Sequence, residues 1–189
     1  PGGHRQFRDP PQPVMGRRAV TRLVAVSNRI VTPRQRAAPA GGLAVGVLAA
    51  MRSRGGLWFG WSGEVIDGEP GPAAITSRQG IDFATIDLPR GELDLYYGGY
   101  CNSALWPMFH YFTGSVQYSD AQRAAYTRVN GLFAARLQPL LRGDDLVWVH
   151  DYHLIPLGHE LRRLAVARPL GFFLHVPFPH VEALRALPG

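Results

Sequence analysis

The sequence predicts an α/β fold in which helices cover both faces of a parallel sheet. Two observations lead to this fold class. Short, almost continuously apolar segments such as 22–28, 146–150 and 169–176 alternate with longer segments that have helical periodicity. Strands that are apolar throughout are typical of parallel sheets buried on both faces, and their alternation with helices is typical of βαβ units. The 189 residues, 46% of them hydrophobic, are enough for one domain with a substantial core.

The first part of the chain contains a tail, a strand, a loop and a helix. Residues 1–20 are rich in Pro, Gly and Arg and lack periodicity, which predicts a flexible tail. The apolar run RLVAVSN at 22–28 predicts a buried strand. Prolines and a glycine pair then predict a loop at 28–42, and LAVGVLAAMRSR at 43–54 predicts a short helix that a second glycine pair ends.

Three further strands are predicted next. The aromatic-rich segment LWFGWSG at 57–63 predicts one strand, and the alternating segments 73–77 and 81–88 predict two more, paired as a hairpin. The following segment, 90–112, is expected to be largely helical up to Pro107, because proline interrupts a helix interior.

The last part of the chain alternates between helices and strands. An apolar stripe predicts a helix at 120–141. Two continuous apolar strands are predicted at 146–150 and 169–176, and each precedes a segment of helical periodicity, at 153–165 and 178–187.

Composition and charge exclude several classes of protein. Of the net charge of +6, residues 1–22 contribute +4 through five Arg and one Asp, which leaves +2 for the rest of the chain. The basic character therefore belongs to the tail and does not predict a nucleic-acid partner. The longest apolar run, 43–51, contains a glycine and is too short to span a bilayer, and no export signal is recognised, so no membrane partner is expected. The single cysteine, Cys101, is expected in the core and fits a reducing, cytoplasmic location.

Polar residues follow the apolar strands at the points where these strands end. Ser27, Asn28 and Arg29 end the first strand, His150 and Asp151 open the segment HDYH after another, and His175 lies at the end of the next. In parallel α/β sheets ligands bind beyond the carboxyl ends of the strands. The sequence therefore predicts a ligand site at this edge, with Arg29 as an anion contact.

Other interpretations of these residues remain open at this point. Arg29 could pair with a surface acid, Asp151 could be the N-cap of the following helix, and His175 could be a hydrogen-bonded core histidine. A zinc site is rejected, because Arg163 stands where the HExxH motif requires its second histidine and no cysteine cluster is present.

Two further segments have backbone suited to phosphate or side chains suited to a sugar ring. Gly41 and Gly42 open a predicted helix, where backbone N–H groups suit phosphate. The pattern is not GxGxxG, so a dinucleotide oxidoreductase is only an alternative. The segment 96–111 is dense in aromatic residues, most of which are expected in the core. Tyr97 and Trp106 are the two that we expect to contact a sugar.

Taken together, seven segments in order along residues 22–188 resemble glycosyltransferase family 20, the family of the trehalose-6-phosphate synthases. These segments are RLVAVSNRI (22–30), AGGLAVGVL (40–48), GGLWFGWSGE (55–64), LWPMFHY (105–111), RVNGLFA (128–134), VWVHDYHLIPL (147–157) and GFFLHVPFP (171–179). The resemblance implies a GT-B fold of two Rossmann-like domains. Residues 21–189 would be the N-terminal, acceptor-side domain, and the C-terminal donor domain would be absent.

The resemblance also implies roles for individual residues. Arg29 would bind the phosphate of glucose 6-phosphate, and Asp151 the hydroxyls of that sugar. His175 would contact the donor glucose. The donor would approach the backbone at Gly41 and Gly42, whereas Tyr97 and Trp106 would belong to the acceptor site, with the tyrosine on its phosphate side.

The reaction implied by the resemblance is glucose transfer from UDP-glucose to glucose 6-phosphate, which forms trehalose 6-phosphate and UDP with retention of anomeric configuration. No metal and no cofactor are expected. Three alternatives remain: a related transferase with another phosphorylated acceptor, such as glucosylglycerol-phosphate synthase, a non-catalytic regulatory subunit, and the oxidoreductase. Whether the protein forms a homo-oligomer is left open.

Overall fold

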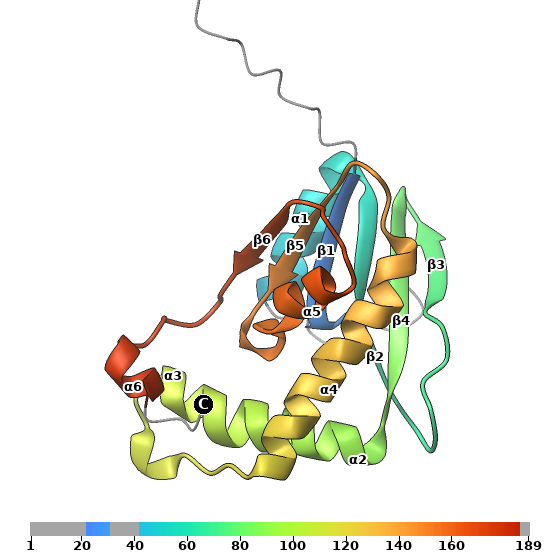
Figure 1. Ribbon diagram of the computed structural model, residues 1–189. Coiled ribbons are helices and arrows are strands. Elements are labelled where there is room, and N and C mark those ends of the chain that lie inside the picture. Colours follow the sequence, from blue (N-terminus) through green and yellow to red (C-terminus); the bar gives the residue numbers. More distant parts are fainter. Residues whose placement is uncertain (1–21, 31–41, 186–189) are drawn as a thin grey trace, which may run out of the picture.

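The computed structural model describes residues 22–30 and 42–185, which form a six-stranded sheet flanked by helices (Figure 1). The strand order is β3-β4-β2-β1-β5-β6, and only β3 runs antiparallel to its neighbour. The predicted α/β fold is confirmed, as is the hairpin of β3 and β4. The strands are β1 (Arg22–Arg29), β2 (Gly56–Ile66), β3 (Ala74–Arg78), β4 (Ile81–Pro89), β5 (Asp145–His150) and β6 (Leu170–Phe173).

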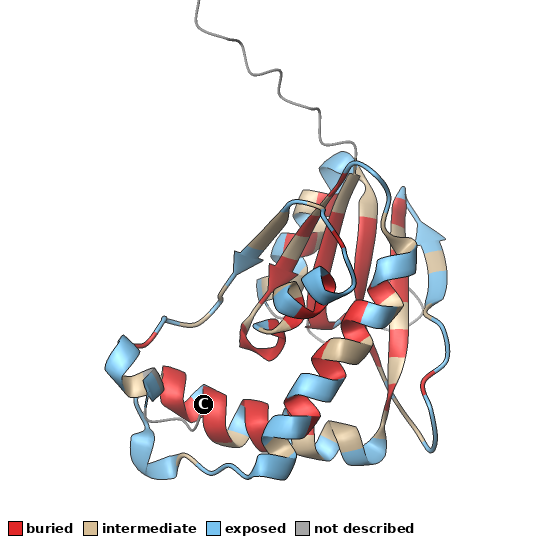
Figure 2. Ribbon diagram, in the orientation of Figure 1, coloured by how far each residue is buried: buried red, intermediate tan, exposed pale blue. Residues whose placement is uncertain are grey.

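Helices cover both faces of the sheet, as predicted. One face packs on α1 (Gly42–Arg54) through a small core that includes Met51 and Trp58. The other face packs on α4 (Asp120–Leu137) and α5 (Leu157–Arg163) through a larger core that includes Phe59 and Phe133. Figure 2 shows the buried residues gathered along the central strands and on the inward sides of the helices.

A long helical run crosses the edge of the sheet where the parallel strands end (Figure 1). It consists of α2 (Arg90–Leu93), the π-helix η1 (Asp94–Leu105) and α3 (Trp106–Phe109). The predicted helical segment is confirmed, but the helix does not end at Pro107. Proline is tolerated there because it lies in the first turn of α3, where its missing N–H is not needed.

Three predicted elements are shorter than expected. The helix predicted at 153–165 begins as a 3₁₀ turn, η4 (Tyr152–Leu154), and becomes α5 only after Pro156. The strand predicted at 169–176 ends at Phe173, because β5, its partner among the described strands, ends at the paired residue His150. The helix predicted at 178–187 is α6 (Val181–Arg185) within the described residues.

Shorter 3₁₀ turns complete the described chain at η2 (Thr113–Ser115) and η3 (Gln138–Leu140), the latter within the helix predicted at 120–141. The predicted tail at 1–20 and most of the loop predicted at 28–42 lie outside the described residues. In the part of the chain that is described, no helix combines the length and apolar character that a membrane span requires.

Candidate functional site

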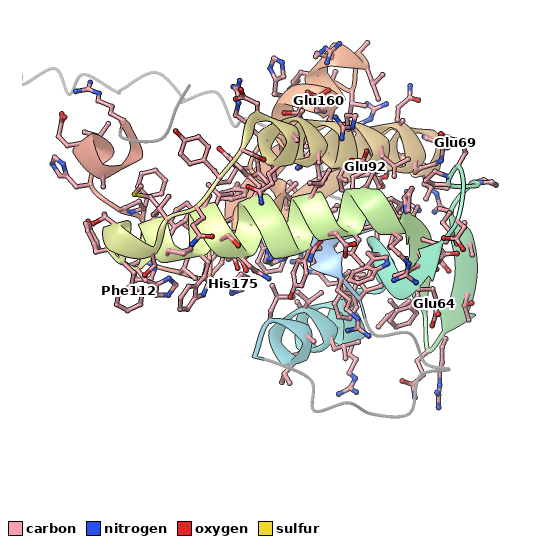
Figure 3. The ribbon with its side chains drawn as sticks, turned by 90° about the horizontal axis from the view of Figure 1, so that it is seen from below. Glu64, Glu69, Glu92, Phe112, Glu160 and His175 are labelled. Atoms are coloured by element: carbon pink, nitrogen blue, oxygen red, sulfur yellow. The ribbon has the colours of Figure 1, made fainter. Side chains whose placement is uncertain are left out.

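The carboxyl ends of β1, β2, β5 and β6 meet at the edge that the η1 run crosses. Figure 3 looks onto this edge from below, across the run, with Phe112 beyond its α3 end and Glu64 toward the opposite end. Arg29 ends β1, Trp61 lies on β2 where that strand pairs with Arg29, and Asp151 directly follows β5. The prediction that the strand-end residues share one edge is therefore confirmed.

Arg29 is positioned by an irregularity at the end of β1. The register between β1 and β2 shifts after Val26, so that Arg29 pairs with Trp61. The Ser27 hydroxyl stabilises this bend, because it donates to the Arg29 carbonyl at 3.2 Å while accepting the indole N–H of Trp58 at 3.0 Å. The Arg29 side chain is exposed, and no acid among the described residues forms an ion pair with it. The alternative that Arg29 pairs with a surface acid thus finds no support there.

The guanidinium of Arg29 rests on Trp61 and Gly63. Its Cζ atom lies 5.5 Å from the Trp61 ring centroid, within cation–π range. Gly63 has φ +95, and a Cβ built there would lie 2.7 Å from Nη2 of Arg29. A side chain at position 63 would therefore occupy the space that the guanidinium fills.

A line of aromatic rings leads from Arg29 to the HDYH segment. Trp61 and Tyr97 have ring centroids 6.4 Å apart, and Tyr97 stacks on His153 at 5.6 Å. Tyr97 is 37% exposed, whereas Trp61 and His153 are buried. The exposed ring suits a sugar face, and the buried pair holds it in place.

Asp151 has a backbone conformation that is rare for any residue except glycine. Its φ of 75 and ψ of 165 lie in a region that costs non-glycine residues about 1–3 kcal/mol. The backbone N–H donates to Phe173 O at 2.8 Å, which holds the turn against the end of β6. Asp151 occupies the N-cap position of η4, but its side chain makes no capping hydrogen bond, so capping does not account for this carboxylate. Strain of this kind gathers at functional sites.

The carboxylate of Asp151 faces two of the histidines. Its Oδ1 accepts the backbone N–H of His175 at 3.4 Å, and its Oδ2 lies 3.8 Å from Nδ1 of His153. His175 itself is exposed, so the core-histidine interpretation is wrong for it. Its ring lies 3.0 Å, nitrogen to nitrogen, from the buried ring of His150.

Burial keeps two of these histidines neutral. It lowers the pKa of His150 to about 4, with the neighbouring His175 adding to the effect, and Asp151 opposes it only in part. Burial likewise lowers the pKa of His153 to about 4, again partly opposed by Asp151. These two rings are therefore uncharged at neutral pH, and a dianionic phosphate would be drawn to the guanidinium of Arg29.

A buried set of hydrogen bonds joins the end of β1 to the HDYH segment. The Tyr96 hydroxyl donates to Asn28 Oδ1 at 2.7 Å and lies 3.4 Å from the His153 carbonyl. Asn130 on α4 donates to the same carbonyl at 3.1 Å, and the Tyr126 hydroxyl donates to the Tyr152 carbonyl at 2.6 Å. These contacts fix the separation between the two strand ends that carry Arg29 and Asp151.

The π-helix brings Tyr97 and Trp106 onto one side of the run. At 3.6 residues per turn, nine residues make about two and a half turns and would place them on opposite faces. The i→i+5 hydrogen bonds of η1 widen each turn and bring nine residues close to two turns. Tyr97, Asn102 and Trp106 are accordingly all exposed, whereas Tyr96, Tyr100 and Leu105 are buried. Trp106 stacks on His110 with centroids 4.2 Å apart, at the far end from Trp61.

The predicted glycine pair is only partly described. Gly41 lies outside the described residues, whereas Gly42 is the exposed first residue of α1. No described atom lies within 4 Å of a Cβ built at Gly42, so its backbone is open to approach from outside. Within residues 22–30 and 42–185, no three His, Cys, Asp or Glu side chains gather as in a metal site.

A pocket of about 510 Å³ lies away from this edge, between α4 and α5. Its lining includes Arg128 and Arg163, and these pair with Glu92 and Glu160 (labelled in Figure 3). The charges of Arg128 and Arg163 are thus compensated by the two glutamates, and none of the predicted site residues lines the pocket. We therefore place the functional site at the strand ends.

Sequence reasoning missed several residues of this site. Trp61 lies in a segment read only as an aromatic-rich strand, and its place inside that strand gave no sign that it would support Arg29. Gly63 follows two residues later in the same segment. Tyr96 and Asn130 gave no signal, because a buried polar side chain on a helix looks like any other polar residue until its partners are known.

Comparison with known proteins gives consistent matches. The model of glycosyltransferase family 20 matches residues 17–189. Trehalose-6-phosphate synthase of Escherichia coli K12 is 50% identical over 169 residues, which cover 89% of this chain and 35% of that protein. The chain thus spans about a third of the length of the curated relatives it matches.

Solved structures agree with these matches. An α,α-trehalose-phosphate synthase (UDP-forming) from Burkholderia xenovorans, in complex with glucose-6-phosphate, superposes with a TM-score of 0.82 at 48% identity and covers 88% of this chain and 36% of that one. An E. coli structure bound with UDP-2-fluoro glucose gives a TM-score of 0.77 at 47% identity, with coverage of 88% and 36%.

Proposed function

Because the chain belongs to glycosyltransferase family 20, we propose that the full-length protein is a UDP-forming α,α-trehalose-phosphate synthase. It transfers glucose from UDP-glucose to glucose 6-phosphate, and the products are trehalose 6-phosphate and UDP. The relatives support this assignment, since they are described as UDP-forming and one was solved with glucose-6-phosphate. The described chain contributes the acceptor side of the site.

One observation supports the acceptor assignment most directly. Arg29, Trp61, Tyr97, His153 and Asp151 form a continuous line along the sheet edge, linked by the contacts given above. The line has a cation at one end, a carboxylate at the other and aromatic rings between them. A sugar phosphate has the matching order of groups, because its phosphate needs a cation, its ring faces stack on aromatics and its hydroxyls donate to a carboxylate.

The protein accelerates this reaction chiefly by orientation and by charge. Arg29 binds the acceptor phosphate and Asp151 binds acceptor hydroxyls, which together fix the attacking hydroxyl relative to the donor. That hydroxyl attacks the anomeric carbon of the donor from the face that UDP leaves, its proton passes to the departing phosphate, and the carbon–oxygen bond to UDP breaks. Configuration is retained without a covalent intermediate. His175 supplies a contact to the donor sugar.

The donor side is shared with the remainder of the protein. Gly42 leaves the backbone open where the donor approaches, and the grip on the nucleotide belongs to the C-terminal domain of the GT-B fold. We propose a cytoplasmic location and no cofactor. The expected partners are one sugar phosphate and one nucleotide sugar.

The test is UDP release by the full-length protein. UDP-glucose is supplied with glucose 6-phosphate, with glycerol 3-phosphate, or with no acceptor. Release with glucose 6-phosphate alone, and a non-reducing disaccharide phosphate as product, supports the proposal. Release with glycerol 3-phosphate alone would assign the other phosphorylated acceptor. No release from well-folded protein with any acceptor would contradict the proposal and favour the regulatory subunit.

A further inference from the structure

Two histidine rings from neighbouring strands share a hydrogen bond at the site. Nδ1 of His150, the last residue of β5, lies 3.0 Å from Nε2 of His175, two residues beyond β6. His150 is 1% exposed and packs on Trp148, with ring centroids 4.1 Å apart. His175 is exposed at the edge where ligands are expected. The ring of His150 therefore belongs to the packed interior, and the ring of His175 is accessible to a ligand.

The hydrogen bond allows only two arrangements of protons between neutral rings. Either His150 donates from Nδ1 to His175, or His175 donates from Nε2 to His150. In the second arrangement the remaining proton of His150 lies on Nε2. That nitrogen is buried and has no hydrogen-bond partner among the described residues. Buried N–H donors without a partner are rarer in folded proteins than buried acceptors without one, so the first arrangement is favoured.

The first arrangement also settles the protons of His175. Since its Nε2 accepts, the proton of neutral His175 must lie on Nδ1. In the described part of the chain no other hydrogen bond of the His175 ring is found, so this N–H belongs to an exposed ring and is left for a ligand. The ring is held at a second point, because the backbone N–H of His175 donates to Asp151 Oδ1.

We propose that His150 is a positioning residue, which orients His175 and holds it in the Nδ1–H tautomer so that this histidine presents a hydrogen-bond donor to a sugar oxygen. The proposal deepens the proposed function and rests on it for the identity of the ligand, which is the donor sugar. Burial lowers the pKa of His150 to about 4, so His150 has a single ring proton at neutral pH and can hold only one tautomer of its neighbour.

Two substitutions of His150 distinguish the proposed positioning role from a role in packing alone. In His150→Asn the side-chain amide nitrogen is bonded to Cγ, as Nδ1 is in histidine, and can donate to the same atom. In His150→Ala both the donor and the ring are lost. His159→Ala on the exposed side of α5 is the matched control for removing a histidine elsewhere.

The first test reads the tautomer directly. The full-length protein is labelled with [¹⁵N]histidine, and the nitrogen signals are assigned to His175 by their loss in His175→Gln. The expected result is a protonated Nδ1 and an unprotonated Nε2 for His175 at neutral pH. Protonation at Nε2 in the unmodified protein would overturn the proposal. This measurement needs no catalytic activity, so its outcome does not depend on the proposed function.

The second test reads the consequence for turnover. kcat/KM for UDP-glucose is expected to fall about tenfold in His150→Ala and to stay within about threefold in His150→Asn and His159→Ala. Equal losses in His150→Ala and His150→Asn, with melting temperatures preserved, would overturn the proposal. If His150→Ala does not fold, the tautomer of His175 and the activity of His150→Asn still test the positioning role of His150. An unmodified protein that releases no UDP would contradict the proposed function and leave the tautomer measurement intact.

Discussion

The guanidinium of Arg29 lies over the ring of Trp61, with Cζ 5.5 Å from the ring centroid. The two residues are paired across the parallel strands β1 and β2 just past a shift in register. The arginine is therefore held before any ligand arrives, by a ring on one side and by the space beside Gly63 on another. A cation that is already in position loses less conformational entropy when it binds an anion.

Replacing Gly63 should weaken phosphate binding without touching any charge. In Gly63→Ala the new Cβ would lie 2.7 Å from Nη2 of Arg29, so the guanidinium must move. We expect the KM for glucose 6-phosphate to rise about tenfold, equivalent to roughly 1.4 kcal/mol. Gly68→Ala is the control, because Gly68 has a similarly positive φ of +122 but no neighbour within 4 Å. Equal effects of the two variants would contradict the role of Gly63.

Replacing Asp151 should separate stability from activity. Asp151→Gly removes strain of about 1–3 kcal/mol and adds about 0.5–1 kcal/mol of unfolded-state entropy, so the melting temperature should hold or rise. Asp151→Asn keeps the strain and the shape. Both variants should lose turnover by at least about a hundredfold, since each removes the carboxylate. A melting temperature that falls sharply in Asp151→Asn while turnover is retained would show that the residue is structural only.

The buried contact between Tyr96 and Asn28 should be measurable as stability. Tyr96→Phe removes the donor and leaves Asn28 Oδ1 without it, which costs about 1–3 kcal/mol of unfolding free energy. Tyr100→Phe is the control, since Tyr100 lies on the same helix and is also buried, but its hydroxyl makes no hydrogen bond among the described residues. Urea denaturation followed by tryptophan fluorescence gives both values. Indistinguishable losses would mean that the Tyr96 hydroxyl adds nothing to stability.

Stability should fall as the pH is lowered from about 6.5 toward 5. His150 and His153 have pKa values near 4 in the folded protein because both are buried, whereas in the unfolded chain they titrate near 6.5. Below pH 6.5 these two histidines bind protons in the unfolded chain but not in the folded protein. The unfolding free energy therefore falls by about 1.4 kcal/mol per pH unit for each histidine.

His150→Asn isolates one of these two contributions. The unfolding free energy of the unmodified protein minus that of His150→Asn should decrease by about 1.5 kcal/mol when the pH is lowered from about 6.5 to about 5.0. Because both proteins share every other titrating group, the difference reports on His150. A difference that is independent of pH would contradict the neutral, buried state of this ring.

Much of the fold and part of the site follow from the sequence. Apolar strands that end in Arg29, Asp151 and His175 were enough to place these residues at one edge, because parallel strands share the direction of their carboxyl ends. The strained turn at Asp151 was not predictable, since an Asp ahead of a helix also fits a common cap. Neither the backbone dihedrals of this turn nor the absence of a capping hydrogen bond leaves a trace in the residue pattern.

The π-helix shows a second limit of sequence reasoning. Its aromatic segment read as helical, but nothing in the residue pattern separates hydrogen bonding from i to i+5 from that of an α-helix, and η1 packs against α4. For this reason the common side of Tyr97 and Trp106 emerges only from the structure. Trp61 was passed over for a related reason, because an aromatic residue in an apolar strand is usually core.

The most direct test of the account compares a phosphorylated acceptor with the same sugar lacking its phosphate. In the full-length protein, kcat/KM is measured for glucose 6-phosphate and for glucose, in the unmodified enzyme and in Arg29→Ala. If Arg29 binds the phosphate, the preference for glucose 6-phosphate should collapse by a factor of about a hundred or more in Arg29→Ala, while the activity with glucose stays nearly constant. A preference that survives in Arg29→Ala would contradict the account and remove Arg29 from the acceptor site.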